Sequence, residues 1–234
     1  MKIDMHIHTI NSGCSINPIN LLKKLCNSKK ITPIIADHNY LTKLDFSING
    51  EEIATDKGEF IGAFITEQVN DKDLFEAMDK VKEQGGIIYL PHPFDSCRSR
   101  SFINFGVLEN KEFIKKVDVV EVFNSRCLNN NPNIMAKNYA EKYNLLKGVG
   151  SDAHFPWELG NTYINIEEFD KDNPKEFLRN LKKANNDFSK NTYCSLANNI
   201  NIKYLSKLSK KIHKSKYFKY IHNHRKNKYI KEEH

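Results

Sequence analysis

The sequence has few cysteines and no long apolar run. Its five cysteines are scattered, odd in number and form no CxxC pair, which argues against a disulfide framework. No run of about 18 apolar residues occurs, so a membrane-spanning helix is not expected. The first residues also lack the basic and apolar segments of a secretory leader. These absences favour a protein that keeps its thiols reduced in the cytoplasm.

Positive charge is plentiful but unevenly placed. The net charge is +7, and residues 203–231 contain eleven Lys or Arg and no acid. We therefore expect one domain over residues 1–190 and a basic, Lys- and Tyr-rich helical extension over 191–234. Such an extension could bind nucleic acid or an anionic membrane surface. The Lys and Asn richness of the whole chain favours the alternative, a helix packed on the domain with a solvated lysine face.

Short apolar runs alternate with segments of helical period. The expected strands are 3–7, 32–36, 60–66, 87–90, 117–120 and 145–149. The expected helices are 18–26, 71–84, 111–116, 133–143 and 174–184. This alternation predicts an α/β fold with parallel strands.

Each expected strand ends in residues that can bind a metal. They are His6, His8, Asp37, His38, Glu67, His92, Glu121, Asp152 and His154. The carboxyl ends of parallel strands carry the active site both in closed α/β barrels and in open sheets. The spacing of residues in the sequence does not distinguish a closed barrel from an open sheet. A barrel brings ligands from many successive strands to one point, so we predict a barrel.

The composition of this set indicates a metal centre. All five histidines of the first 200 residues belong to it. Imidazole and carboxylate ligands suit Zn, Mn or Fe(II). The set exceeds what one ion needs, so two or three ions are expected, and a carboxylate such as Glu67 could bridge two of them. Such clusters activate water and stabilise a phosphoryl oxygen.

The ordered motifs resemble those of the PHP (polymerase and histidinol phosphatase) family of phosphoesterases. The matching segments are 4–9, 36–39, 66–67, 91–93, 121–126 and 151–154. The resemblance covers roughly residues 1 to 165, and the segment 152–160 is similar to the end of small stand-alone members. It implies a distorted barrel of seven strands, (β/α)7, with two or three divalent ions at the carboxyl ends of the strands, and hydrolysis of a phosphoester.

The resemblance also implies roles for individual residues. One ion would be held by His6, His8, Glu67 and Asp152. A second would share Glu67 and add His92 and a residue of the 121–124 stretch, either Glu121 or Asn124. A third would be held by His38 and His154. Cys14 stands where the family usually has Asp or His, so it is either a thiolate ligand or a plain loop cysteine.

Candidate catalytic residues are Asp37, His38 and Arg126, with Asp37 as a supporting residue or proton carrier. Arg126, Arg98 and Asn124 are candidates for substrate binding, because guanidinium groups bind phosphate through paired hydrogen bonds. Trp157 follows His154 and could form a pocket wall or stack a base.

Three functions compete at this point. The first is a metal-dependent phosphoesterase acting on a phosphorylated small molecule or nucleotide. The second is a nuclease of the same chemistry that holds RNA or DNA with the basic extension. The third is a non-catalytic domain that keeps the fold for metal binding and regulation.

Overall fold

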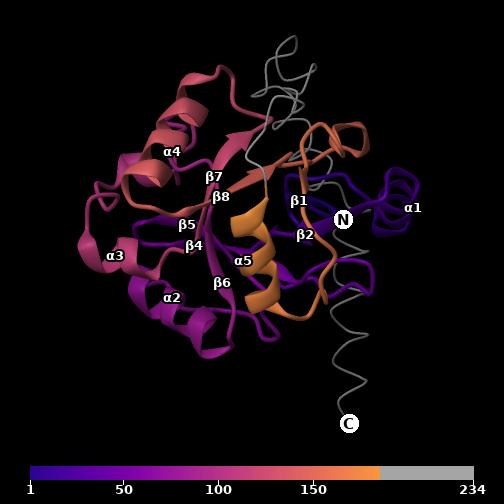
Figure 1. Ribbon diagram of the computed structural model, residues 1–234, viewed down its shortest axis with the longest axis horizontal. Coiled ribbons are helices and arrows are strands. Elements are labelled where there is room, and N and C mark those ends of the chain that lie inside the picture. Colours follow the sequence, from indigo (N-terminus) through magenta and orange to yellow (C-terminus); the bar gives the residue numbers. More distant parts are fainter. Residues whose placement is uncertain (185–234) are drawn as a thin grey trace.

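The computed structural model describes residues 1–184, which form two β-sheets covered by helices (Figure 1). The smaller sheet has the order β2-β1-β9, with β1 Lys2–Ile7, β2 Ile31–Ile35 and β9 Ile164–Asn165. The larger sheet runs in chain order through β3 Asp37–His38, β4 Gly50–Thr55, β5 Gly58–Ala63, β6 Ile87–Leu90, β7 Val119–Asn124 and β8 Leu146–Gly150. The expected extension 191–234 lies outside the described residues.

The helices follow the predicted periodicity. They are α1 Ile19–Lys29, α2 Leu74–Glu83, α3 Lys111–Lys116, α4 Asn131–Lys142 and α5 Pro174–Lys183, with 3-10 turns η1 Phe102–Asn104 and η2 Pro156–Glu158. Helix α1 packs against β2, α2 against β5 and β6, α4 against β7, and α5 against β8. The large core lies between the larger sheet and helices α2 to α5, and Phe60, Phe113 and Phe177 are fully buried in it. Leu22 and Cys26 of α1 pack in a second, smaller cluster. No helix within residues 1–184 is both long and apolar enough to cross a bilayer.

The parallel arrangement is confirmed for most strands. β1 and β2, which α1 connects, pair in parallel. β6, β7 and β8 also pair in parallel in that order. β5 is the exception in the larger sheet, because it runs antiparallel to both β4 and β6. Its carboxyl end therefore lies at the opposite edge of the sheet from the carboxyl ends of its neighbours.

The strands do not close into a single sheet within the described residues, so the expected closed barrel is not observed. The extended segment 31–38 contributes to both sheets, since its first part pairs with β1 and its last two residues pair with β4. Isolated bridges, Ile34 with Ile48 and Ile7 with Ala153, link the margins of the sheets. At the second margin the Asp152 amide donates to the His6 carbonyl (2.7 Å), and the His8 amide donates to the Ala153 carbonyl (3.0 Å).

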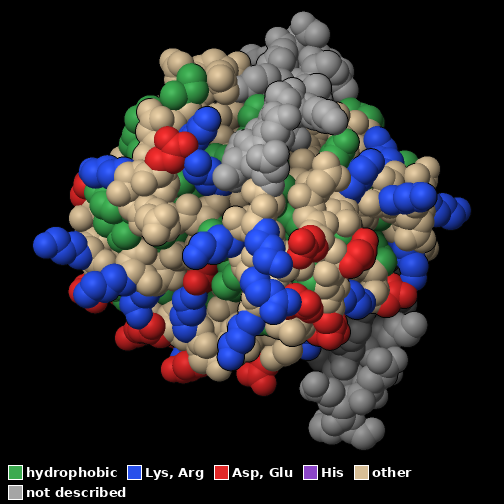
Figure 2. Space-filling model, viewed as in Figure 1, with side chains coloured by type: hydrophobic (Ala, Val, Ile, Leu, Met, Phe, Trp, Pro, Cys, Tyr) green, Lys and Arg blue, Asp and Glu red, His purple; other side chains and the backbone are tan. Residues whose placement is uncertain are grey.

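The face that carries α5 shows positive and negative side chains intermixed (Figure 2). Arg179 pairs with Glu176 at 3.0 Å, and Lys183 pairs with Glu167 at 3.2 Å. This face is therefore not a one-sign electrostatic surface of the kind that nucleic acid favours.

Candidate metal centre

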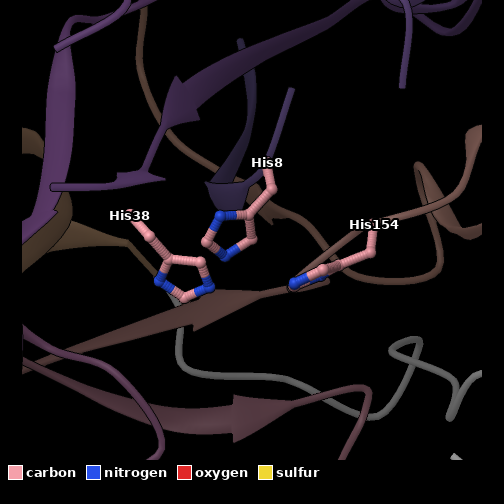
Figure 3. Close-up of side chains that lie close together, drawn as sticks. All are labelled: His8, His38 and His154. Carbon is pink, nitrogen blue, oxygen red and sulfur yellow. The ribbon is translucent and has the colours of Figure 1, made fainter. Parts of the chain in front are cut away.

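The structure brings together all five histidines that the sequence places at strand ends. Ring centroids lie 5.0 Å apart for His6 and His8, and 5.6 Å apart for His6 and His92. His8 lies 4.5 Å from His38 and 4.2 Å from His154. Figure 3 shows the imidazoles of His8, His38 and His154 turned toward a common point. Of the five histidines, His6 is on β1 and His38 is on β3, while His8, His92 and His154 lie in the segments that follow β1, β6 and β8.

A carboxylate that the sequence analysis missed lies at the centre of the histidines. Glu52 is on β4 and is almost fully buried. Its Oε2 is 2.8 Å from His38 Nδ1 and 3.5 Å from His8 Nε2. Its Oε1 is 3.2 Å from His92 Nε2 and 3.8 Å from His6 Nε2. A second missed carboxylate, Glu59 on β5, belongs to a donor group with His38 and Glu52.

Glu67, predicted as the bridging ligand, is not brought to this cluster. Its side chain is exposed, and its backbone amide donates to Gln84 Oε1 at 2.8 Å. The reason is the antiparallel direction of β5, which carries Glu67 to the far edge of the sheet. A sequence signal for this reversal exists: the segment 55–58 reads Thr-Asp-Lys-Gly, which is typical of a hairpin turn.

Asp152 provides the second buried carboxylate of the cluster. Its Oδ1 lies 3.3 Å from His154 Nδ1, 3.4 Å from His8 Nε2 and 3.7 Å from His6 Nε2. This oxygen is buried and accepts no hydrogen bond. A buried carboxylate oxygen without a partner is costly, and a cation among the three imidazoles would satisfy it. The donor set therefore fits a divalent metal ion.

Glu121 contacts His6 on the side of the ring that faces away from the other imidazoles. Glu121 Oε1 is 3.1 Å from His6 Nδ1 and accepts a hydrogen bond from Tyr89 at 3.0 Å. Oε2 accepts from the His92 amide (2.7 Å) and from Asn124 Nδ2 (2.9 Å). A carboxylate behind a histidine fixes its tautomer and leaves the other nitrogen for the metal. Glu121 thus orients His6. Asn124 links Glu121 to Asp152, because Asn124 Nδ2 also lies 3.3 Å from Asp152 Oδ2.

Asp37 has a similar supporting place. Its carboxylate accepts from the Thr9 amide (2.7 Å), the Thr9 hydroxyl (2.6 Å), the Thr42 hydroxyl (2.5 Å) and the Ser12 hydroxyl (2.7 Å). Ser12 Oγ is in turn 3.0 Å from His8 Nδ1. Because both its oxygens are engaged, Asp37 anchors the loop after β1 and orients His8. The geometry does not suit it to carry protons at the reaction centre.

Cys14 lies next to two histidines of the cluster. Its Sγ lies 3.0 Å from His154 Nε2. His154 Nδ1 is 2.8 Å from the Asp152 carbonyl oxygen, so its Nε2 faces Cys14. Cys14 also hydrogen-bonds the side chain of His38. One thiol and the imidazoles of His8, His38 and His154 therefore line the same space.

Two arginines flank the carboxylates. Arg98 Nη2 is 2.5 Å from Asp152 Oδ2, and Arg98 Nε is 3.1 Å from Asp95 Oδ2. Arg126 is buried, with Nη1 3.4 Å from the Asp152 carbonyl oxygen and 3.6 Å from Glu158 Oε2. Both predicted substrate-binding arginines thus adjoin the cluster.

Two residues of the cluster have left-handed backbones, and buried charges shift the pKa values of its side chains. His92 (φ 33°) and Asp152 (φ 53°) share this conformation with Lys30, Asn39, Phe64 and Asn144 in the described residues, and it costs about 1–3 kcal/mol each. Burial and the nearby His38 lower the pKa of His8 to about 4, so its imidazole is neutral, as a metal ligand requires. Burial would raise the pKa of Asp152, but Arg98 and His6 hold it well below its usual range.

Comparison with known proteins relates the chain to one family. Residues 130–186 match a family model described as PHP-associated. The chain is 52% identical over 231 residues to MJ0417, an uncharacterised protein of Methanocaldococcus jannaschii, covering 91% of this chain and 98% of the relative. A two-domain protein of Bacteroides vulgatus, containing a predicted PHP-like metal-dependent phosphoesterase, matches with a TM-score of 0.56 and 17% identity. The chain belongs to the PHP family.

The similarity of this PHP-family chain to solved structures is a similarity of fold. The match covers 77% of this chain and 63% of the Bacteroides chain. An amidohydrolase of Chromobacterium violaceum, solved with bound sulfate and no metal, matches with a TM-score of 0.53 and 13% identity over 77% of this chain and 96% of that one. At such identities, shared architecture does not transfer a substrate. The function of this PHP-family chain is therefore argued from its own site.

Proposed function

We propose that the chain is a metal-dependent phosphoesterase that hydrolyses a phosphomonoester or phosphodiester of a small molecule or nucleotide. The observation that carries the proposal is the position of Glu52. This single buried carboxylate lies within 4 Å of nitrogens from four histidines: His6, His8, His38 and His92. Buried charges of this density are stable when they are paired or coordinate metals.

Overlapping donor groups support two or three ions. The groups are His6, His8 and Glu52; His6, His92 and Asp152; His8, His38 and His154; and His38, Glu52 and Glu59. Shared members place these positions next to one another. Nitrogen and oxygen donors suit Zn, Mn or Fe(II), and a Cys14 ligand would favour Zn or Fe(II) at the position of His38 and His154.

The chain's own residues supply the remaining functions. Bound divalent ions would act as Lewis acids and lower the pKa of a water molecule. Arg126 and Arg98 adjoin Asp152, and we assign them the binding of phosphoryl oxygens, while Asn124 holds the carboxylates in position. Glu121 and Asp37 keep His6 and His8 oriented through the contacts described above. We place this chemistry in the cytoplasm, where the four described cysteines, none of which forms a disulfide, stay reduced.

The test is a panel of phosphoesters assayed with Mn, Zn and Fe(II), run beside metal analysis of the purified protein. We expect bound transition metal and hydrolysis of at least one phosphoester, with both lost in His8→Ala. A protein that binds no transition metal and hydrolyses no phosphoester under any of these conditions would refute the proposal.

A further inference from the structure

Tyr89 on β6 is the largest side chain that is fully buried within residues 1–184. A buried phenol hydroxyl without a hydrogen-bond partner is costly, so a buried tyrosine usually donates to an acceptor. The acceptor of the Tyr89 hydroxyl is Oε1 of Glu121, at 3.0 Å. The tyrosine is thereby connected to the carboxylate that orients His6.

The pairing of β6 with β7 sets this contact. The two strands run in parallel, with Tyr89 opposite Val119. Glu121 follows Val119 by two residues, so its side chain lies on the same face of the sheet as that of Tyr89 and one step nearer the carboxyl ends of the strands. A phenylalanine at residue 89 would fill the same space, but only a hydroxyl reaches the carboxylate.

The Glu121 carboxylate is held at both oxygens. Oε2 accepts from the His92 amide (2.7 Å) and from Asn124 Nδ2 (2.9 Å). Oε1 accepts from Tyr89 and lies 3.1 Å from His6 Nδ1. Burial and the charge of Glu121 hold the pKa of Tyr89 well above its usual range, so the hydroxyl keeps its proton and remains a donor.

The same Oε1 decides which nitrogen of His6 carries the proton. His6 Nε2 lies 3.0 Å from His8 Nε2, so these two nitrogens face each other within one donor group. An imidazole binds a metal through Nε2 when its proton is on Nδ1 and has an acceptor there. Because Tyr89 also donates to Oε1, that oxygen draws less on the His6 proton, and His6 stays a neutral imidazole.

We propose that Tyr89 is a positioning residue that acts through Glu121 to fix His6 as a metal ligand. This inference rests on the metal-dependent part of the proposed function and adds a residue that touches neither the ions nor the substrate. Without the hydroxyl, one acceptor position of Oε1 is left empty in a dry environment, and the carboxylate holds His6 less firmly. Changes to such outer partners typically weaken metal binding about 10- to 100-fold.

The test deletes one oxygen atom. Full-length wild type and Tyr89→Phe are stripped with a chelator and titrated with Zn in competition with a chromophoric chelator. We expect the Kd for Zn to rise about 10- to 100-fold in Tyr89→Phe, and the d–d absorption of cobalt(II)-loaded protein to shift. At saturating metal, kcat for a hydrolysed phosphoester should change while KM stays the same, because a fully buried residue does not contact the substrate.

Tyr139→Phe is the matched control. Its hydroxyl is also buried, but it donates to the Leu108 backbone carbonyl at 2.8 Å instead of to a carboxylate of the cluster. Both variants should therefore melt at a lower temperature than wild type without metal, and only Tyr89→Phe should show a smaller rise in melting temperature on adding Zn. A Tyr89→Phe protein with the Zn affinity of wild type overturns the proposal, and so does an equal loss of affinity in Tyr139→Phe.

A double-mutant cycle tests the route through Glu121. Glu121→Gln alone should weaken Zn binding, and adding Tyr89→Phe to it should weaken binding no more than about 2-fold further, because the acceptor is already changed. If Tyr89→Phe weakens binding equally in the presence and absence of Glu121→Gln, the tyrosine does not act through this carboxylate and the proposal is wrong.

Failure of this inference is distinguishable from failure of the proposed function. Wild type that binds Zn but hydrolyses no phosphoester refutes the phosphoesterase, and the Zn affinities still decide the role of Tyr89. Wild type that hydrolyses a phosphoester, with Tyr89→Phe unchanged in Zn affinity, refutes the role of Tyr89 alone. Wild type that binds no transition metal refutes both.

Discussion

The sequence predicts Glu67 as a ligand, whereas the structure brings Glu52 into the cluster and leaves Glu67 outside it. Glu52 contacts four imidazoles, whereas Glu67 is exposed at the other edge of the sheet. We expect Glu52→Gln to lose bound metal on dialysis and to reduce hydrolysis by at least about 10- to 100-fold, as changes around metal ligands do. Metal content and kcat/KM measure this.

Glu67→Gln is the matched control, because it makes the same chemical change outside the cluster. It should keep the metal content and activity of wild type. Loss of metal in Glu67→Gln with retention in Glu52→Gln would contradict the placement of β4 and β5 described above.

Whether Cys14 is a ligand determines which metals suit the position lined by His38 and His154. A thiolate beside His38 and His154 is a soft ligand, and it should give cobalt(II)-substituted protein a sulfur-to-metal charge-transfer band in the near ultraviolet. Cys14→Ser should abolish that band while tetrahedral or octahedral d–d absorption persists. Cys97→Ser changes an exposed thiol and should leave the spectrum intact. A wild-type spectrum with no charge-transfer band would make Cys14 a loop cysteine.

At the scale of elements, strand direction explains what the sequence could and could not predict. The histidines were predictable because they follow apolar runs that prove to be parallel strands. Glu52 was not, because it lies within a strand of a hairpin rather than after an apolar run. Two-residue alternation places Glu51 and Glu52 on opposite faces, and only the pairing partners reveal which face is the site.

Packing between β8 and β1 depends on Gly150. A Cβ at this position would lie 2.2 Å from Glu121 Oε1 and 2.4 Å from the Cβ of His6. Gly150→Ala must therefore displace His6 or its supporting carboxylate, and overpacking typically costs about 1–3 kcal/mol. We expect a melting temperature about 2–12 °C lower and weaker metal binding, measured by calorimetry and metal titration.

Gly13→Ala serves as the comparison, since no atom lies within 4 Å of the added Cβ. Its melting temperature should stay within the small range of surface substitutions. If Gly150→Ala were equally mild, the close approach of β8 to β1 at His6 would be wrong.

For the whole molecule, the sequence predicts most elements, but it misses β4 and β9 and does not determine closure. Apolar period and turn residues identify α1, α2, β6 and α3 to within a few residues. Closure depends on ladders between distant segments, and here the segment 31–38 pairs with two different sheets. Local patterning carries no information about such a division. The interruptions fall beside His8, His38 and Asp152, so the margins of the two sheets are also where the metal centre lies.

This placement makes metal binding a stability term for the entire fold. The cluster draws its donors from both sheets, because His6 is on β1 and His8 follows it, whereas Glu52 is on β4 and Asp152 follows β8. Ions held by His6, His8 and Glu52, or by His6, His92 and Asp152, would therefore join the two sheets. A ligand that binds only the folded state at 100 times its Kd adds about 2.7 kcal/mol. For a chain of this size that corresponds to about 5–11 °C in melting temperature per ion.

Chelation should lower the melting temperature by this amount, and added Mn or Zn should restore it. Glu52→Gln should melt at nearly the same temperature with and without chelator, because it has lost the shared carboxylate. Wild type whose melting temperature is unchanged after verified metal removal would show that the sheets hold together without the ions.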